Sequence, residues 1–292
     1  MFTGVFRYPG GKSRVRKLIL SYAPENYQEY REPFVGGGGI FWGVDQSKKR
    51  WINDINPGLM AVYYALRDRP VDFICKCRAI RPAQQGEDQV RSREKGGGKK
   101  TYNKRLKNVF DYLKYNEEVD QALRYFFLNR TVWGGRVNYD PAMESRMYYS
   151  NPQGWNIVNT NKLEKAAKIL QQVHITNGDY KDLLAAPGDD VWIYLDPPYL
   201  KNTRLNRSDK LYQYGFSDID HIHFVQMLHE CPHYWCLSYD DDPKVRKWFS
   251  NFYIYEVKWK YSGTSMPEKK TGEELIITNY LVKHEKLQKV LC

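Results

Sequence analysis

Hydrophobic and polar positions in the first sixty residues alternate as they do in an α/β domain. A helical pattern over residues 12–24 precedes a short apolar strand at residues 30–35, which ends in four glycines. A second strand ends at Asp54 and leads into a helix near Pro57. Strand, glycine turn and helix in this order predict a parallel, doubly wound sheet.

The same style returns in the last third of the chain. An apolar run at residues 191–195 predicts a buried strand, and the two runs at residues 252–261 and 273–283 predict an antiparallel pair at one edge. Helices are expected at residues 161–173, 219–230 and 245–251, and a further strand at residues 234–241.

The middle of the chain has a different composition. Residues 78–107 are polar and basic around a triple glycine, which predicts a mobile arm because such a segment cannot bury a core. A helical pattern follows at residues 109–129, and a Gly/aromatic turn comes after it. Residues 61–155 are therefore predicted to be an insertion into an α/β domain made of residues 1–60 and 156–292.

The composition of the chain indicates what kind of partner it binds. The chain has 292 residues, a formal net charge of +11 and a sequence pI of about 9.2, which indicates an anionic partner. Its aromatic share of 15% favours nucleic acid, because bases stack on rings. No membrane span or signal peptide is apparent. The five cysteines, an odd number without zinc-ligand spacing, indicate free thiols in a reducing cytoplasm.

The glycine turns exclude two nucleotide motifs. Lys12 follows two glycines, but Phe6 stands where a phosphate loop needs its first glycine. Residues 36–39 lack the full dinucleotide fingerprint. What remains is a strand that ends in glycines ahead of Asp54, an arrangement that suits the ribose of one nucleoside. A glycine-rich turn with a helix-capping aspartate is the alternative.

The turn after the buried strand at residues 191–195 is stiff and polar. Asp196, Pro197, Pro198 and Tyr199 follow the strand directly, so in a doubly wound sheet they lie at its carboxyl end, where ligands bind. Two prolines fix the backbone and hold its acceptors in place. A carboxylate and a carbonyl that accept from an exocyclic amine would draw its nitrogen toward tetrahedral geometry, while Tyr199 stacks on a flipped base.

Together these motifs resemble the Dam-like adenine-N6 DNA methyltransferases. "RYPGGK", "EPFVGGGG", "NDINPGL", "FFLNRTVWGGRVN", "NGDYKDLL", "DPPY", "CLSYDD" and "KKTGEELIITNY" occur in the family's order. The resemblance implies a Rossmann-like class I methyltransferase sheet with helices on both faces and an inserted, mostly helical target-recognition region. It also implies methyl transfer from S-adenosylmethionine to adenine N6, without a metal.

The resemblance also implies a set of site residues. Asp196, Pro197, Pro198 and Tyr199 would be catalytic by holding the target amine. The cofactor-binding residues would be Tyr8, Gly10, Lys12, Phe34, Gly36, Gly38, Asp54, Asp179, Tyr180 and Asp196.

The DNA-reading segment departs from the family's pattern. After "NRTVW" this chain has the shorter "GGRVNYD", and the basic arm at residues 91–107 is an elaboration. Arg130, Arg136 and Asn138 are candidate base contacts, because Arg recognises guanine and Asn adenine in the major groove; contact with the DNA backbone alone is the alternative. Lys99 and Lys100 are candidate DNA contacts of the arm.

The expected function is site-specific adenine-N6 methylation of double-stranded DNA in the cytoplasm of a bacterium or a phage-infected cell, by a monomer that has no membrane partner. The resemblance allows for a cognate restriction endonuclease. Three alternatives stay open: methylation of cytosine N4, methylation of RNA adenine, and a non-catalytic DNA-binding protein on the same fold.

Overall fold

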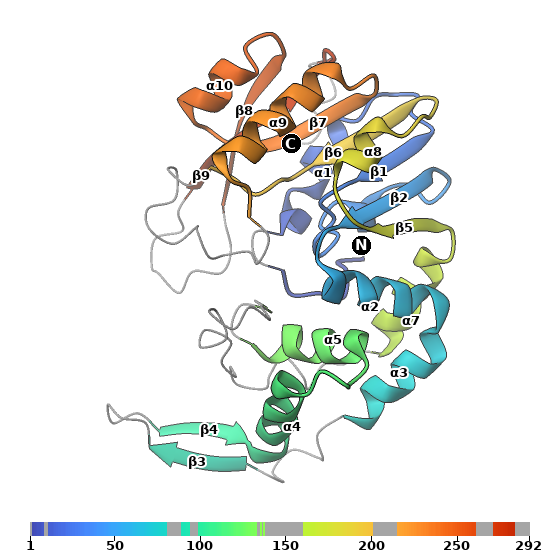
Figure 1. Ribbon diagram of the computed structural model, residues 1–292, viewed down its shortest axis with the longest axis vertical. Helices are drawn as coiled ribbons and strands as arrows, with labels where there is room; N and C mark the ends of the chain where they lie inside the picture. The colour runs from blue at the N-terminus through green and yellow to red at the C-terminus, as the bar shows by residue number, and fades with distance from the viewer. Residues whose placement is uncertain are drawn as a thin grey trace. The chain divides into compact units, whose positions relative to one another are not determined.

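The computed structural model divides the chain into two compact units (Figure 1). It describes residues 2–8, 11–80, 89–93, 99–132, 135, 137, 160–200, 215–260 and 271–283. The first unit comprises Met1–Thr3, Gly10–Asn56 and Gln172–Cys292, and the second comprises Gly4–Pro9 and Pro57–Gln171.

The first unit is built on a seven-stranded sheet with the order β5-β2-β1-β6-β7-β9-β8. Its strands are β1 (Glu29–Glu32), β2 (Lys49–Asp54), β5 (Val173–Asn177), β6 (Val191–Leu195), β7 (Tyr234–Asp240), β8 (Tyr253–Lys260) and β9 (Thr271–Thr278). The five strands from β5 to β7 run parallel. β9 pairs antiparallel with both β7 and β8, so the predicted antiparallel pair at one edge is confirmed.

Strand order reverses between β1 and β6. β1 pairs with β2 on one side and with β6 on the other, and all three are parallel. From the carboxyl ends of β1 and β6 the chain therefore continues in opposite directions, and this is the position at which doubly wound sheets bind ligands. The glycine turn follows β1 and Asp196 follows β6, so the fold brings these two motifs to one edge.

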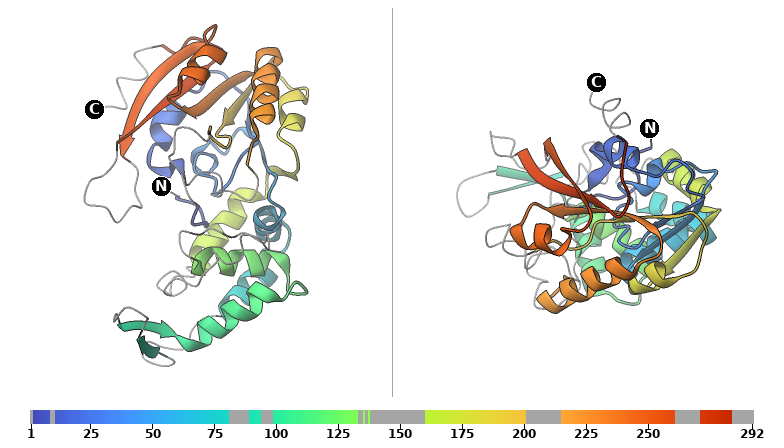
Figure 2. Two further views of the ribbon diagram at one scale, coloured as in Figure 1. Left: turned by 60° about the vertical axis from the view of Figure 1, so that its left-hand side comes forward. Right: turned by 90° about the horizontal axis from the view of Figure 1, so that it is seen from above.

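Helices cover both faces of this sheet (Figure 2). They are η1 (Lys12–Arg14), α1 (Arg16–Ser21), η2 (Phe41–Gly43), α8 (Lys181–Ala185), α9 (Asp218–Glu230) and α10 (Pro243–Trp248). Along β6, Val191, Ile193 and Leu195 pack in one core with residues of α8, α9 and α10. The alternate residues of β6 belong to the other face, where α1 lies. The predicted α/β, Rossmann-like sheet with helices on both faces is confirmed.

The second unit is mostly helical. It contains α2 (Pro57–Asp68), α3 (Pro70–Ala79), α4 (Lys104–Tyr115), α5 (Gln121–Thr131), α7 (Thr160–Leu170), β3 (Gln89–Arg93) and β4 (Lys99–Asn103). α2 contacts α5 and α7, and Gly58 lets α2 approach the Tyr125 ring of α5, because a Cβ at this position would lie 2.6 Å from the ring. The sequence assigns residues 161–173 to the first domain, whereas α7 groups with the second unit.

The helix expected over residues 109–129 is two helices. α4 ends at Tyr115, and α5 begins after Asp120, whose carboxylate accepts hydrogen bonds from the amides of Ala122 and Leu123. This side-chain cap satisfies two amides that have no partner inside the helix. The apolar periodicity continues across the break, which explains why the sequence pattern suggests a single helix.

The basic arm contains regular structure. β3 and β4 form a two-stranded antiparallel ribbon that pairs Arg91 with Thr101 and Arg93 with Lys99. The sequence predicts a mobile arm and does not predict these two strands. The rest of the arm up to residue 98 lies outside the described residues. In the described parts of both units, no helix has the length and apolar character needed to span a membrane.

Candidate active site

The turn after β6 places a carboxylate at the sheet's switch point. All five residues of β6 are buried, whereas the Asp196 side chain is 25% exposed. Pro197 and Pro198 have no amide hydrogen to continue the ladder, so pairing stops where the prolines begin. The turn is therefore rigid next to a packed strand, and the Asp196 carboxylate remains accessible.

Four side chains from distant parts of the sequence meet at this turn. The Lys12 ammonium lies 2.6 Å from the Tyr199 hydroxyl oxygen, 3.1 Å from Glu274 Oε2 and 3.4 Å from Asp196 Oδ1. The Tyr199 oxygen lies 2.9 Å from Asp196 Oδ1 and 3.0 Å from Glu274 Oε2. Lys12, Asp196, Tyr199 and Glu274 are called the catalytic-turn cluster below. Sequence reasoning missed Glu274.

The cluster holds one ammonium between two carboxylates. Glu274 is 1% exposed, and burial raises its pKa to about 7 although Lys12 opposes the shift. Burial, followed by the negative charges of Asp196 and Glu274, raises the pKa of Tyr199 well above its ordinary value. Tyr199 is therefore a neutral hydroxyl at physiological pH, with one hydrogen to donate to two possible acceptors.

The Tyr199 ring is packed by a second tyrosine. Tyr199 and Tyr239 stack with ring centroids 5.4 Å apart and planes inclined by 26°. The Tyr239 hydroxyl lies 2.6 Å from Nδ1 of His221, on α9. Tyr239, which lies on β7 and is itself held by His221, thereby fixes the position of the Tyr199 ring. The stacking of Tyr199 on a target base stays a prediction.

The glycine turn is held by Asp54. Gly36 and Gly38 have φ angles of +48° and +72°, which favour glycine. Asp54 accepts a hydrogen bond at Oδ2 from the Gly36 amide at 2.9 Å and one at Oδ1 from the Asn56 amide at 3.0 Å. Burial raises the pKa of Asp54 to about 6, although these amides favour the charged form. The amide of Ile55 is a third backbone donor to this carboxylate. Asp54 therefore holds the turn and caps the chain before α2, and a carboxylate has about four acceptor positions, one more than these amides use.

Two motifs that are separate in sequence pack together at Gly39. A Cβ at Gly39 would lie 2.9 Å from the backbone nitrogen of Lys12. Only a residue without a side chain allows this approach. The glycine run therefore positions the backbone of Lys12, and through it the ammonium of the catalytic-turn cluster.

Asn53 connects the carboxyl ends of three strands, and sequence reasoning missed it. Its Nδ2 donates to the carbonyls of Pro33 and Gly178, at 3.1 and 2.9 Å, and its Oδ1 accepts from Thr176 at 2.9 Å. The residue is 1% exposed, so these bonds satisfy a buried amide. Asn53 thereby fixes the ends of β1, β2 and β5 relative to one another.

An aromatic cluster lies beside the glycine turn. Phe34 packs against Tyr180 with centroids 5.3 Å apart, and Phe216 and Phe224 pack against both rings. Phe216 was not predicted. Asp179, next to Tyr180, is exposed and lies 3.6 Å from the Lys181 ammonium. Tyr180 and Phe224 are buried in the core, whereas Phe34 and Phe216 are partly buried against it at the ends of β1 and β5.

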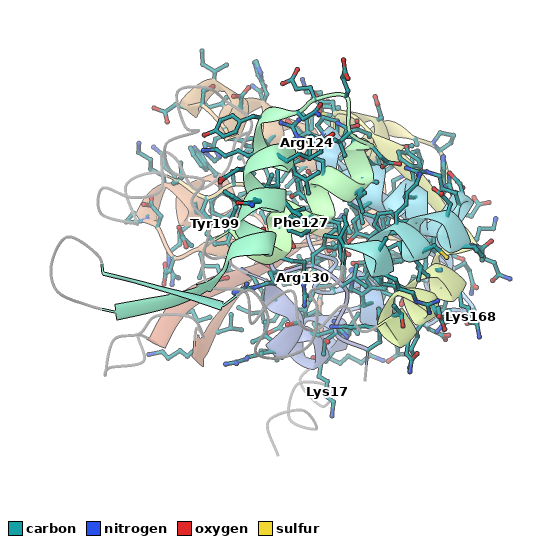
Figure 3. The ribbon with its side chains drawn as sticks, turned by 90° about the horizontal axis from the view of Figure 1, so that it is seen from below. Lys17, Arg124, Phe127, Arg130, Lys168 and Tyr199 are labelled. Atoms are coloured by element: carbon teal, nitrogen blue, oxygen red, sulfur yellow. The ribbon has the colours of Figure 1, made fainter. Side chains whose placement is uncertain are left out.

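The other predicted residues belong to the second unit or lie outside the described residues. Tyr8 groups with the second unit, as does Arg130 at the end of α5 (Figure 3). Burial, together with the nearby charge of Arg7, lowers the pKa of Arg130. Lys99 and Lys100 lie on β4. Gly10, Arg136 and Asn138 lie outside the described residues.

Over the part of the chain that the structure describes, no group of three or more His, Cys, Asp or Glu could hold a metal ion.

Comparisons with known proteins agree on one family. A family model described as D12 class N6 adenine-specific DNA methyltransferase matches residues 8–263. The chain is 22% identical over 281 residues to the type II methyltransferase M1.LlaDCHI of Lactococcus lactis subsp. cremoris, covering 94% of each chain. It is 27% identical over 229 residues to the type II methyltransferase M.MjaIII of Methanocaldococcus jannaschii, covering 75% of this chain and 77% of the relative. The DNA adenine methylase of Escherichia coli K12 is 21% identical over 286 residues, with 93% of each chain covered.

Proposed function

Because the chain belongs to the D12 class N6 adenine-specific DNA methyltransferase family, we propose that its catalytic-turn cluster and glycine turn methylate adenine N6 in double-stranded DNA with S-adenosylmethionine as donor. The chain is an enzyme and an adenine-N6 DNA methyltransferase, as its motifs predict. The observation that carries the proposed site is the meeting of Asp196, Tyr199 and Lys12 at the point where strand order reverses.

Asp196 is suited to orient an amine. Its Oδ1 is fixed by Tyr199 and lies near Lys12, while its Oδ2 has no hydrogen bond to the described residues. A carboxylate held at one oxygen can accept from an exocyclic N–H at the other. The Pro197 carbonyl is the proposed second acceptor. Two acceptors on one amine pull its nitrogen toward tetrahedral geometry and free the lone pair for attack.

The first unit offers surfaces that fit a nucleoside-containing donor. Aromatic rings at Phe34 and Tyr180 suit an adenine, Gly36 and Gly38 admit close approach to the backbone, and Asp54 has acceptor capacity for ribose hydroxyls. S-adenosylmethionine supplies an electrophilic methyl group. The proposed cofactor residues are the first-unit residues that the resemblance implies, with Phe216 added to the aromatic rings; the role of Tyr8, in the second unit, stays a prediction.

Asp54→Ala is expected to weaken S-adenosylmethionine binding by about 1–3 kcal/mol, because the variant loses a hydrogen bond to a charged group. Isothermal titration calorimetry measures this change. Asp45→Ala removes an exposed carboxylate that accepts from the Ser47 amide and serves as the control. An affinity of Asp54→Ala equal to that of the wild type would remove Asp54 from the cofactor site.

The β3–β4 ribbon is proposed to contact DNA. The ribbon pairs Arg93 with Lys99, and Arg91 lies two residues before Arg93 on β3. A two-stranded ribbon fits the major groove, and cations bind phosphates. Lys100, Arg130, Arg136 and Asn138 remain proposed contacts as well.

Changing Arg91, Arg93 and Lys99 together to Gln is expected to flatten the salt dependence of DNA binding, by about 0.9 in slope for each lost phosphate contact. Binding isotherms over a series of salt concentrations measure the slope. Lys165→Gln with Lys168→Gln is the control, because both side chains are exposed on α7 and Lys168 points outward (Figure 3). A slope unchanged by the ribbon variant would contradict phosphate contact by the ribbon.

Expression in a methylation-deficient host, followed by mapping of modified bases, tests the proposed function. We expect N6-methyladenine within one sequence motif. Finding only N4-methylcytosine, or no modification, would contradict the proposed function.

Relatives named type II methyltransferases favour a cognate restriction endonuclease. DNA from this host should then resist an endonuclease that cuts the mapped motif. We also propose that the enzyme is a monomer, which sedimentation analysis checks.

A further inference from the structure

Glu274 is a buried carboxylate. The proposed activation of the amine gives it no role. It lies on β9, is 1% exposed, and its Oε2 contacts Lys12 and Tyr199. Its Oε1 is buried and has no hydrogen-bond partner in the described parts of the chain. A second carboxylate beside Asp196 is costly to bury, so its presence in the cluster calls for an explanation.

Tyr199 links the two carboxylates. Its oxygen is within hydrogen-bond distance of Asp196 Oδ1 on one side and of Glu274 Oε2 on the other, at 2.9 and 3.0 Å. A neutral hydroxyl donates one hydrogen and accepts at two lone pairs. Tyr199 is therefore placed to accept a proton from Asp196 on one side while its hydroxyl donates to Glu274 on the other.

Methylation of an amine releases a proton. The nitrogen carries two hydrogens before the reaction and one after it, so one N–H bond must break with its electron pair left on nitrogen. Asp196 is the nearest carboxylate to the amine in the proposed geometry. If this proton stayed on Asp196, the carboxylate needed for the next turnover would be neutral.

We propose that Glu274 is the acceptor of the proton that the amine releases, reached from Asp196 through the Tyr199 hydroxyl. The inference rests on the proposed function. The amine proton passes to Asp196 Oδ2, and a rotation of the carboxyl group about its Cβ–Cγ bond brings this hydrogen to the Tyr199 oxygen. Asp196 gives this proton to the Tyr199 oxygen as the Tyr199 hydroxyl hydrogen passes to Glu274 Oε2. Asp196 ends ionised, Tyr199 neutral and Glu274 protonated. After the product leaves, the proton returns through Tyr199 to Asp196, whose side chain is 25% exposed, and from there passes to solvent.

The surroundings of Glu274 suit this role. Lys12 faces it from the N-terminal turn, and Asp196 and Tyr199 from the turn after β6. The paired positions on the neighbouring strands are Asp240 on β7 and Val257 on β8. Burial, with the charge of Asp196, outweighs Lys12 and raises the pKa of Glu274 to about 7. Glu274 thus gains and loses a proton near neutral pH.

Glu274→Gln separates this role from a purely structural one. The amide oxygen of Gln can still accept from Lys12 and Tyr199, but the side chain cannot take up a proton. Single-turnover methylation should rise through about pH 7 in the wild type. In Glu274→Gln it should be slower by about 10²-fold above that pH, without the rise, while KM for DNA stays similar. Tyr199→Phe should also remove the rise.

A stability measurement gives a readout that does not need activity. The folded pKa of Glu274 is raised to about 7 from 4.5, so its contribution to stability is present below about pH 4.5 and is lost as pH rises through about 7. The Tm of the wild type should therefore fall relative to that of Glu274→Gln across this window. Glu256→Gln, an exposed change on β8, should show no such relative change.

The outcomes distinguish the two claims. A wild type that does not methylate adenine contradicts the proposed function. An active wild type whose rise near pH 7 persists at full rate in Glu274→Gln overturns only the proton-acceptor role. A constant Tm difference between the wild type and Glu274→Gln from about pH 4.5 to about pH 8 also overturns it, since Glu274 would then not titrate in this range.

Discussion

Asp196→Ala is expected to reduce methyl transfer by about 10³-fold or more while the protein stays folded. The carboxylate is the acceptor proposed to orient the target amine, and removing one polar group that acts on the reacting atoms costs enzymes on this order. The side chain is 25% exposed, so its loss leaves no large cavity. Single-turnover transfer of a labelled methyl group to DNA measures the change.

Two controls accompany this variant. Asp189→Ala removes an exposed carboxylate ahead of β6 and should keep the wild-type rate. Cofactor affinity of Asp196→Ala should stay within a few-fold of the wild type. Turnover of Asp196→Ala close to that of the wild type would exclude Asp196 from orienting the amine.

Lys12→Met is expected to lower the free energy of unfolding by about 3–5 kcal/mol. The ammonium is 5% exposed and lies between the carboxylates of Glu274 and Asp196; without it, two negative charges face each other across Tyr199. The loss should be largest above about pH 7, where Glu274 is ionised, and smaller at lower pH, where Glu274 takes up a proton. Urea unfolding at several pH values measures it.

The double variant Lys12→Met with Glu274→Gln tests the cause. It removes one charge of each sign and should recover much of the lost stability. Lys17→Met, an exposed change on α1 (Figure 3), should have little effect. A double variant no more stable than Lys12→Met would show that the loss has another origin than uncompensated buried charge.

The sequence predicts those site residues whose positions follow from their neighbours along the chain. Asp196 follows a run of apolar residues and stands before two prolines, and Asp54 ends a strand before a helix; both positions follow from strand ends that are visible in the chain. Because carboxyl ends of parallel strands share one edge, these motifs are expected to lie on one side of the sheet. The structure places Gly36, Asp54 and Asp196 there.

The other site residues, and one helix boundary, were not predicted. The site residues are positioned by contacts between segments that lie far apart in the sequence. Glu274 enters the site because β9 inserts beside β7 in register with Asp240, and nothing in its local sequence marks it as buried. Asn53 looks like an ordinary strand residue, yet its side chain connects three strand ends. The break between α4 and α5 depends on Asp120 as a cap, a short-range signal that continuous apolar periodicity conceals.

The most direct test of the proposed site is the identity of the base that the purified chain modifies. Double-stranded DNA is incubated with the protein and S-adenosylmethionine that carries a labelled methyl group, and the DNA is digested to nucleosides and separated. We predict that the label appears in N6-methyladenine with the wild type and is lost with Asp196→Ala. Label in N4-methylcytosine, or label in N6-methyladenine that Asp196→Ala leaves unchanged, would contradict the proposed site.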